Sequence, residues 1–138
     1  MKKSKILLAA ISITIVNIFI GAITCGGLFN WVYQIEPTNV WKSMAEISFP
    51  LMLITTFITD LIFVYVYTLI KNSIPTQNNY TKGIIYGLIV CGIGLIPGMI
   101  STYLYMTVAS GVVIYWTISG IIVNPINGII AAIICNKD

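Results

Sequence analysis

The sequence predicts an all-α membrane protein, a single bundle of four transmembrane helices with both termini in the cytoplasm. Of its 138 residues, 58% are hydrophobic and 8% are charged, whereas soluble domains contain roughly 25% charged residues. Such a composition cannot provide a water-facing surface. The chain also contains four apolar stretches, and each reaches the roughly 20 helical residues that cross a bilayer.

The four spans are expected at residues 6–29, 47–70, 83–108 and 111–135, within one domain that covers residues 1–138. Polar loops separate the first three spans. A tight turn near Ser110 separates the last two, so these two helices should be antiparallel neighbours.

The first apolar stretch has an alternative interpretation as a cleaved leader. Lys2, Lys3 and Lys5 precede it, as basic residues precede the apolar segment of a signal peptide. The stretch is longer than the roughly 7 to 15 apolar residues of such a segment. Thr24 is also bulky for the residue before a lipoprotein-type cleavage at Cys25. We therefore expect the stretch to remain as the first helix.

The distribution of lysines predicts that both termini are cytoplasmic, because lysine-rich ends of membrane helices stay on that side. Lysines occur near both termini and beside the second loop: Lys2, Lys3, Lys5, Lys71, Lys82 and Lys137. The first loop instead carries Glu36, Glu46 and Lys42. Interface-seeking aromatic residues collect on the predicted outer side: Trp31, Trp41, Tyr103, Tyr105, Tyr115 and Trp116.

The net charge of +3 comes entirely from lysines and is explained by this topology. We therefore expect a multi-pass protein of the cell membrane, with the lipid bilayer as its surroundings and no nucleic-acid partner. The first loop also contains a pattern typical of a helix start, with Thr38 or Asn39 as its cap.

Small and polar residues recur at helical spacing on all four spans, which indicates the faces that pack inward. Glycines of the third and fourth spans are expected to allow close helix contact: Gly87, Gly94, Gly98, Gly120 and Gly128. Packing within the bundle, in a homo-oligomer or against partner membrane helices is the simplest explanation of these stripes. A polar pathway or pocket along the same faces is the alternative.

Asp60 is the one charge-capable side chain inside a predicted span, and it lies near mid-membrane at about the depth of Asn17 and Asn124. An ionised carboxylate there costs on the order of 2.5 to 3.5 kcal/mol, so such acids usually face the bundle interior and indicate function. No lysine lies inside a span to pair with it. Asp60 is therefore either protonated or held by polar neighbours, water or a bound cation.

A candidate mid-membrane polar site follows from this reasoning and contains five side chains: Asp60, Asn17, Thr56, Asn124 and Asn127. The alternative is a neutral Asp60 that merely bonds to a threonine or a backbone carbonyl. Pro97 and Pro125 lie close to the same depth and are expected to break or kink their helices, because each removes a backbone donor and frees the carbonyl one turn earlier.

Catalytic chemistry has little support in the sequence. The chain has no histidine, and its cysteines, Cys25, Cys91 and Cys135, form no close-spaced pair. Metal and haem ligation therefore lack their usual donors. Neither a catalytic triad nor a phosphate-binding glycine loop is evident. We expect no enzyme activity, no metal and no cofactor.

A resemblance can be drawn from glycines and aromatic residues spread along the chain: Gly27, Trp31, Tyr33, Lys82, Gly83, Tyr86, Gly87, Pro97, Trp116, Gly120 and Gly128. The pattern resembles that of small bacterial membrane proteins with four helices and no assigned activity. The resemblance implies the fold only and implies no function. The membrane in which we expect the chain is the bacterial cytoplasmic (inner) membrane.

Two classes of function remain, with a membrane enzyme as a distant third. The favoured expectation is a non-catalytic accessory or immunity-type protein whose helix faces bind other helices. The alternative is a small transporter or channel-like protein that handles a cation, a proton or a small polar molecule at the polar site around Asp60.

Overall fold

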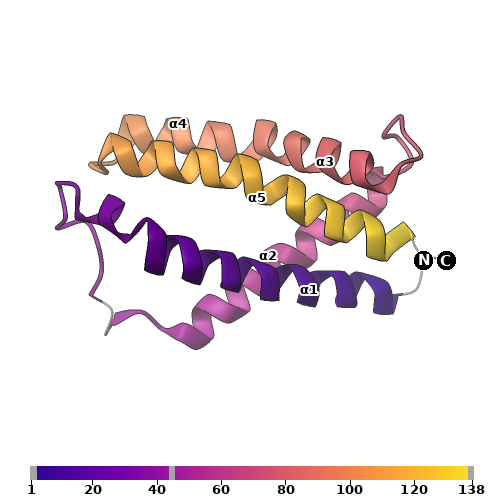
Figure 1. The fold of residues 1–138 in the computed structure, drawn as a ribbon, viewed down its shortest axis with the longest axis horizontal. Coiled ribbons are helices and arrows are strands. Elements are labelled where there is room, and N and C mark those ends of the chain that lie inside the picture. The colour runs from indigo at the N-terminus through magenta and orange to yellow at the C-terminus, as the bar shows by residue number, and fades with distance from the viewer. Residues whose placement is uncertain (1–2, 44–45, 137–138) are drawn as a thin grey trace.

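The chain folds into four long helices that lie roughly along one axis, with one of them crossing the others (Figure 1). The computed structural model describes residues 3–43 and 46–136. Helix α1 spans Lys3–Ile23, α2 spans Phe49–Ile70, and α5 spans Ser110–Asn136. The third long helix consists of α3 (Asn79–Val90), the π-helical turn η4 (Cys91–Leu95) and α4 (Ile96–Tyr105).

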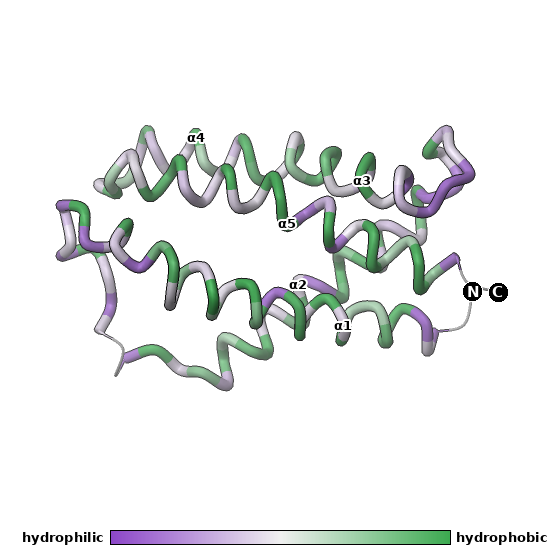
Figure 2. Tube along the Cα trace, viewed as in Figure 1, coloured by the Kyte–Doolittle hydropathy of each residue, from purple (hydrophilic) through white to green (hydrophobic). Residues whose placement is uncertain are grey.

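All four helices are long and apolar enough to cross a membrane: Lys3–Leu28, Phe49–Ile70, Asn79–Tyr105 and Ser110–Asn136. Hydrophobic residues dominate them, whereas hydrophilic residues collect in the connections (Figure 2). The all-helical fold and the four apolar helices agree with the prediction. A hydrophilic stretch interrupts α5 near its middle (Figure 2).

The third helix begins and ends earlier than the predicted span 83–108. It begins at Asn79 because the side chain of Asn78 caps it, accepting hydrogen bonds from the backbone N–H groups of Tyr80 at 2.9 Å and Thr81 at 3.4 Å. The chain becomes extended at Met106. The predicted span began later because it was located by hydropathy, and the residues at the start of the helix are polar.

The first loop contains a short 3-10 helix, η2 (Asn30–Gln34), after the π-helical turn η1 (Thr24–Leu28) that ends the first long helix. The predicted helix start at Thr38 or Asn39 is wrong, because residues 39–43 form a turn and irregular chain without a helix, and α2 begins at Phe49. The hydroxyl of Ser48 caps α2, accepting from the N–H of Leu51 at 3.4 Å.

Helices α3 and α5 form the closest contact in the bundle, as expected for antiparallel neighbours. At Gly83, Gly87 and Gly128 the two backbones touch, and a Cβ atom at any of these positions would clash with backbone atoms of the other helix. Gly120 faces the side chain of Leu95.

The expected packing role is wrong for Gly94 and Gly98 within this chain. A Cβ at either position would meet no described atom within 4 Å, because both glycines lie on the exposed face of the third helix. Pro97 lies in the first turn of α4, directly after the π-helical turn. Pro125 does not break its helix, because α5 continues through it to Asn136.

The core lies at the end of the bundle that holds both termini (Figure 1). Its largest fully buried side chains are Tyr67 of α2 and Tyr86 of α3, whose ring centroids are 5.2 Å apart. The hydroxyl of Tyr86 donates to the carbonyl of Phe63 at 2.6 Å. A second, smaller cluster of Val32, Ala109 and Val112 lies near the opposite end.

Candidate functional site

Asp60 projects from the middle of α2 toward α1 and is only 5% exposed. The hydroxyl of Thr14 donates to its Oδ2 at 2.8 Å, and the Nδ2 of Asn17 donates to its Oδ1 at 3.0 Å. Thr14 and Asn17 lie nearly one turn apart on α1, so they present their side chains to the same point. Two neutral side chains therefore hold the carboxyl group.

Asn127 extends this network to a third helix. Its Nδ2 donates to the Oδ1 of Asn17 at 3.0 Å, so that one chain of hydrogen bonds runs from α5 through α1 to Asp60 of α2. Asn127 is 5% exposed. The network thus connects three helices inside the bundle.

The network leaves acceptor capacity unused. The Oδ1 of Asn127 is buried and has no hydrogen-bond partner among the described residues, which costs about 1–3 kcal/mol for a group of this kind. Each oxygen of an ionised carboxylate can accept two hydrogen bonds, and each oxygen of Asp60 accepts one. The site therefore presents oxygen atoms that a hydrogen-bond donor or a cation would complement.

The hydroxyl of Thr14 serves two acceptors with a single proton. It lies 2.9 Å from the carbonyl oxygen of Ala10 and 2.8 Å from the Oδ2 of Asp60. A threonine hydroxyl carries only one hydrogen, so its hydrogen bond to Asp60 is shared. An ionised Asp60 would therefore gain from an additional positive group nearby.

A cleft of about 490 Å³ lies beside this network and is bounded by α1, α2, α5 and the third long helix. Its polar lining consists of Asn17, Thr24, Thr59, Asp60, Ser119, Asn124 and Asn127. Aromatic rings of Phe63, Tyr115 and Trp116 form much of the remaining wall. The cleft thus combines one acidic group with amides, hydroxyls and aromatic faces.

An aromatic cluster lies at the end of the cleft away from the core. The indole Nε1 of Trp116 donates to the hydroxyl of Tyr33 at 2.9 Å, and that hydroxyl donates to the sulfur of Cys25 at 3.5 Å. Burial, followed by the hydrogen bond to Cys25, raises the pKa of Tyr33 to about 12. Tyr33 therefore remains a neutral donor at neutral pH and adds no second negative charge.

The structure brings together most of the predicted polar site. Asp60, Asn17 and Asn127 share one hydrogen-bond network, and Asn124 lines the same cleft, although its amide donates to the carbonyl of Gly120 instead. Thr56 neither lines this cleft nor hydrogen-bonds to Asp60 in the described structure, so its place in the site stays a prediction.

The threonine that hydrogen-bonds to Asp60 is Thr14 of α1, whereas the sequence predicted Thr56 of α2. Thr56 lies one turn before Asp60 on the same helix. Thr14 belongs to the same stripe of polar residues as Asn17, three positions earlier. That spacing was the available signal for its proximity to Asp60.

Comparison with known proteins found no matching family model, no similar curated protein and no similar solved structure.

Proposed function

We propose that this chain is a non-catalytic, multi-pass protein of the cell membrane that binds a monovalent cation at Asp60 and transports it. The observation that carries this proposal is the environment of Asp60. Asp60 is 5% exposed, its carboxyl group is bonded by neutral side chains, and it borders a cleft that other polar side chains also line. An acid in the interior of a membrane bundle usually belongs to an ion or substrate pathway.

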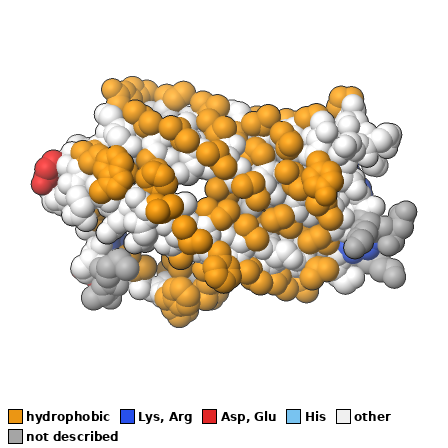
Figure 3. All heavy atoms as spheres, in the orientation of Figure 1, with side chains coloured by type: hydrophobic (Ala, Val, Ile, Leu, Met, Phe, Trp, Pro, Cys, Tyr) orange, Lys and Arg blue, Asp and Glu red, His pale blue; other side chains and the backbone are white. Residues whose placement is uncertain are grey.

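Insertion in a membrane is supported by the outer surface of the bundle. Large hydrophobic side chains are exposed along all four helices, and they cover the face seen in Figure 3. In water such a surface would be an extensive apolar patch, whereas hydrocarbon chains of lipid would solvate it.

Cytoplasmic termini are supported by the charges at the two ends of the bundle. Lys3, Lys71 and Lys82 lie at the helix ends near both termini, whereas Glu36 lies in the first loop at the opposite end. Lys2 and Lys137, from which the sequence also predicted cytoplasmic termini, lie outside the described residues. This distribution follows the rule that lysine-rich ends stay in the cytoplasm.

Reporter fusions test this topology. Fusions after residues 40, 76, 110 and 138 should be read as outside, inside, outside and inside, because four helices return the chain to its starting side. Paired reporters that are active on opposite sides of the membrane provide the measurement. A C-terminal fusion that is active outside would contradict the proposed orientation.

The cleft offers a cation a defined set of partners. The carboxylate of Asp60 supplies the charge, and the unpartnered Oδ1 of Asn127 supplies a further acceptor. Toward the termini, the core closes the bundle, and Lys71 donates to the side chain of Asn136 at 3.1 Å. Transport would require this packed end to open while the opposite end closes, as in alternating access.

The variant Asp60→Asn tests the proposal. In proteoliposomes, uptake of radiolabelled methylammonium is expected to fall to the level of protein-free vesicles, because the amide keeps the shape of the side chain but cannot ionise. Glu36→Gln is the matched control, since Glu36 is exposed in the first loop and its hydrogen bonds to described residues are local ones with Thr38. Equal methylammonium uptake by Asp60→Asn and by the unchanged protein would overturn the proposal.

An accessory role with partner helices is the second candidate, and the exposed glycines favour it. Gly94, Gly98 and Ser101 lie at intervals of four and three residues on the open face of the third helix. Small residues at such spacing allow close approach of helices in membranes. A homo-oligomer or another membrane helix could therefore pack there without disturbing the cleft.

A further inference from the structure

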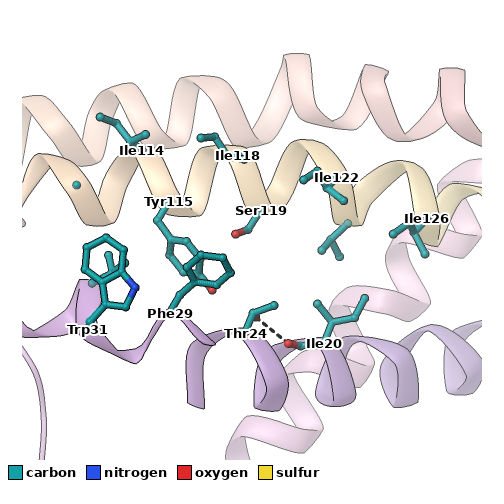
Figure 4. A pocket seen from close by; sticks show the side chains of 13 residues that line it. Ile20, Thr24, Phe29, Trp31, Ile114, Tyr115, Ile118, Ser119, Ile122 and Ile126 are labelled. Atoms are coloured by element: carbon teal, nitrogen blue, oxygen red, sulfur yellow. Dashed lines mark hydrogen bonds between the residues drawn. The ribbon is translucent and has the colours of Figure 1, made fainter. Parts of the chain in front are cut away.

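A second, largely apolar groove lies next to the polar cleft. It has a volume of about 400 Å³ and lies between α1 with its following turns and α5. Isoleucines dominate its α5 side: Ile114, Ile118, Ile122 and Ile126. They recur every four residues and therefore occupy one face of the helix. Figure 4 shows this row opposite Ile20 and Thr24, with Phe29 and Tyr115 meeting between them.

The groove and the cleft share part of their walls. Five residues line both: Ile20, Thr24, Tyr115, Ser119 and Val123. In Figure 4, Thr24 and Ser119 lie on opposite sides of the groove. A ligand seated at this junction would contact apolar side chains on one side and the network of Asp60 on the other.

We propose that the ligand of this protein is a lipophilic monocation, whose charged centre lies in the cleft near Asp60 and whose apolar groups occupy the isoleucine groove. The proposal rests on the cation site proposed above and specifies the chemical class that the site accepts. Charge complementarity is the first argument, because the hydrogen bonds to Asp60 come from neutral side chains and leave its charge uncompensated.

The aromatic side chains provide the second argument. Tyr115 lines both spaces, and its ring centroid is 5.2 Å from that of Phe29 and 6.1 Å from that of Tyr33. Aromatic faces attract cations, and they do so most strongly where water is excluded. A lipophilic cation can use these faces because its hydration shell is weak, whereas a small hydrated ion would lose much of its hydration.

The dimensions and position of the groove provide the third argument. Sites for drug-sized ligands enclose roughly 300–1,000 Å³ and combine mostly apolar walls with a few polar groups, and the groove and the cleft each lie in this range. Ile114 and Ile118 are 59% and 55% exposed. The groove is therefore open along the side of the bundle that we propose faces lipid, where such a cation would concentrate.

Tetraphenylphosphonium provides the test, because tetraphenylborate has nearly the same shape and the opposite charge. We expect purified protein in nanodiscs to bind tetraphenylphosphonium, measured by calorimetry and by quenching of tryptophan fluorescence, since Trp31 and Trp116 border the two spaces. Tetraphenylborate should not bind. Asp60→Asn should weaken tetraphenylphosphonium binding on the order of 30-fold, the effect of removing one partner of a buried charge pair.

The groove is tested separately by Ile118→Ser. This variant should weaken tetraphenylphosphonium binding about 5- to 10-fold, because it removes apolar contact and leaves Asp60 in place. Ile93→Ser is the matched control, since Ile93 is 76% exposed and lies outside both spaces; it should bind like the unchanged protein.

The outcomes separate this inference from the proposed function. Methylammonium uptake that depends on Asp60, together with no binding of tetraphenylphosphonium, would overturn the lipophilic ligand and leave the cation site. Equal binding of tetraphenylphosphonium and tetraphenylborate, or equal binding by Asp60→Asn, would also overturn it. Absence of both methylammonium uptake and tetraphenylphosphonium binding would overturn both proposals.

Discussion

Replacing Gly87 by leucine is expected to prevent the contact between α3 and α5 and to destabilise the protein by more than about 3 kcal/mol. At this position a Cβ would clash with backbone atoms of Asn124 and Pro125. Overpacking of a core commonly costs about 1–3 kcal/mol when side chains can adjust. Backbone atoms inside a helix cannot rotate away, so the cost should exceed this range. The loss of helical structure during titration with a denaturing detergent provides the measurement.

Gly94→Leu is the matched control for this variant. Gly94 lies on the same long helix, but an added Cβ there meets no described atom within 4 Å. Its unfolding should therefore match that of the unchanged protein. If Gly94→Leu instead separates an oligomer into monomers, the exposed glycine face binds another helix. A normally folded Gly87→Leu protein would show that the contact between α3 and α5 is looser than described.

Replacing Asn17 by leucine is expected to destabilise the fold by about 2 kcal/mol or more. Among the described residues, Asn17 hydrogen-bonds to both Asp60 and Asn127, so its loss leaves the Oδ1 of Asp60 and the Nδ2 of Asn127 without these partners. Each buried polar group left unpaired costs about 1–3 kcal/mol. The free energy of unfolding in detergent micelles provides the measurement.

Ser12→Leu is the control for Asn17→Leu, because Ser12 lies on the same helix and its hydroxyl bonds to the carbonyl of Leu8. This variant should change stability little. A triple variant with leucine at positions 17, 60 and 127 should be more stable than Asn17→Leu alone, since it leaves no polar side chain of the network unpaired. Equal stability of Asn17→Leu and Ser12→Leu would contradict the described network.

The fold and the centre of the site were predictable because both depend on strong, simple signals. Hydropathy located the four helices, since each one is apolar over the length that crosses a bilayer. The placement of Asp60 in the interior followed from the cost of an unpaired acid in an apolar surrounding. The stripe that contains Asn17 correctly identified the neighbouring face of α1.

The errors occurred where a local pattern has more than one structural meaning. Glycines at helical spacing predict a helix face without bulky side chains. The spacing does not show whether another helix packs against that face. Gly87 therefore contacts α5, whereas Gly94 is exposed. Thr56 was chosen by its position along the chain, whereas the crossing of α1 and α2 brings Thr14 to Asp60. The apolar groove depends on the divergence of α1 and α5, which no local sequence pattern encodes.

The resonance of the Asp60 carboxyl group tests the cation site most directly. The chain contains two aspartates, Asp60 and Asp138, so isotope labelling of aspartate in an Asp138→Asn variant leaves one signal. In bilayers at constant pH, saturating methylammonium is expected to shift this signal, because the cation binds at the carboxylate that Thr14 and Asn17 hold. A carboxyl resonance that does not change at saturating methylammonium would contradict the proposal that Asp60 binds the cation.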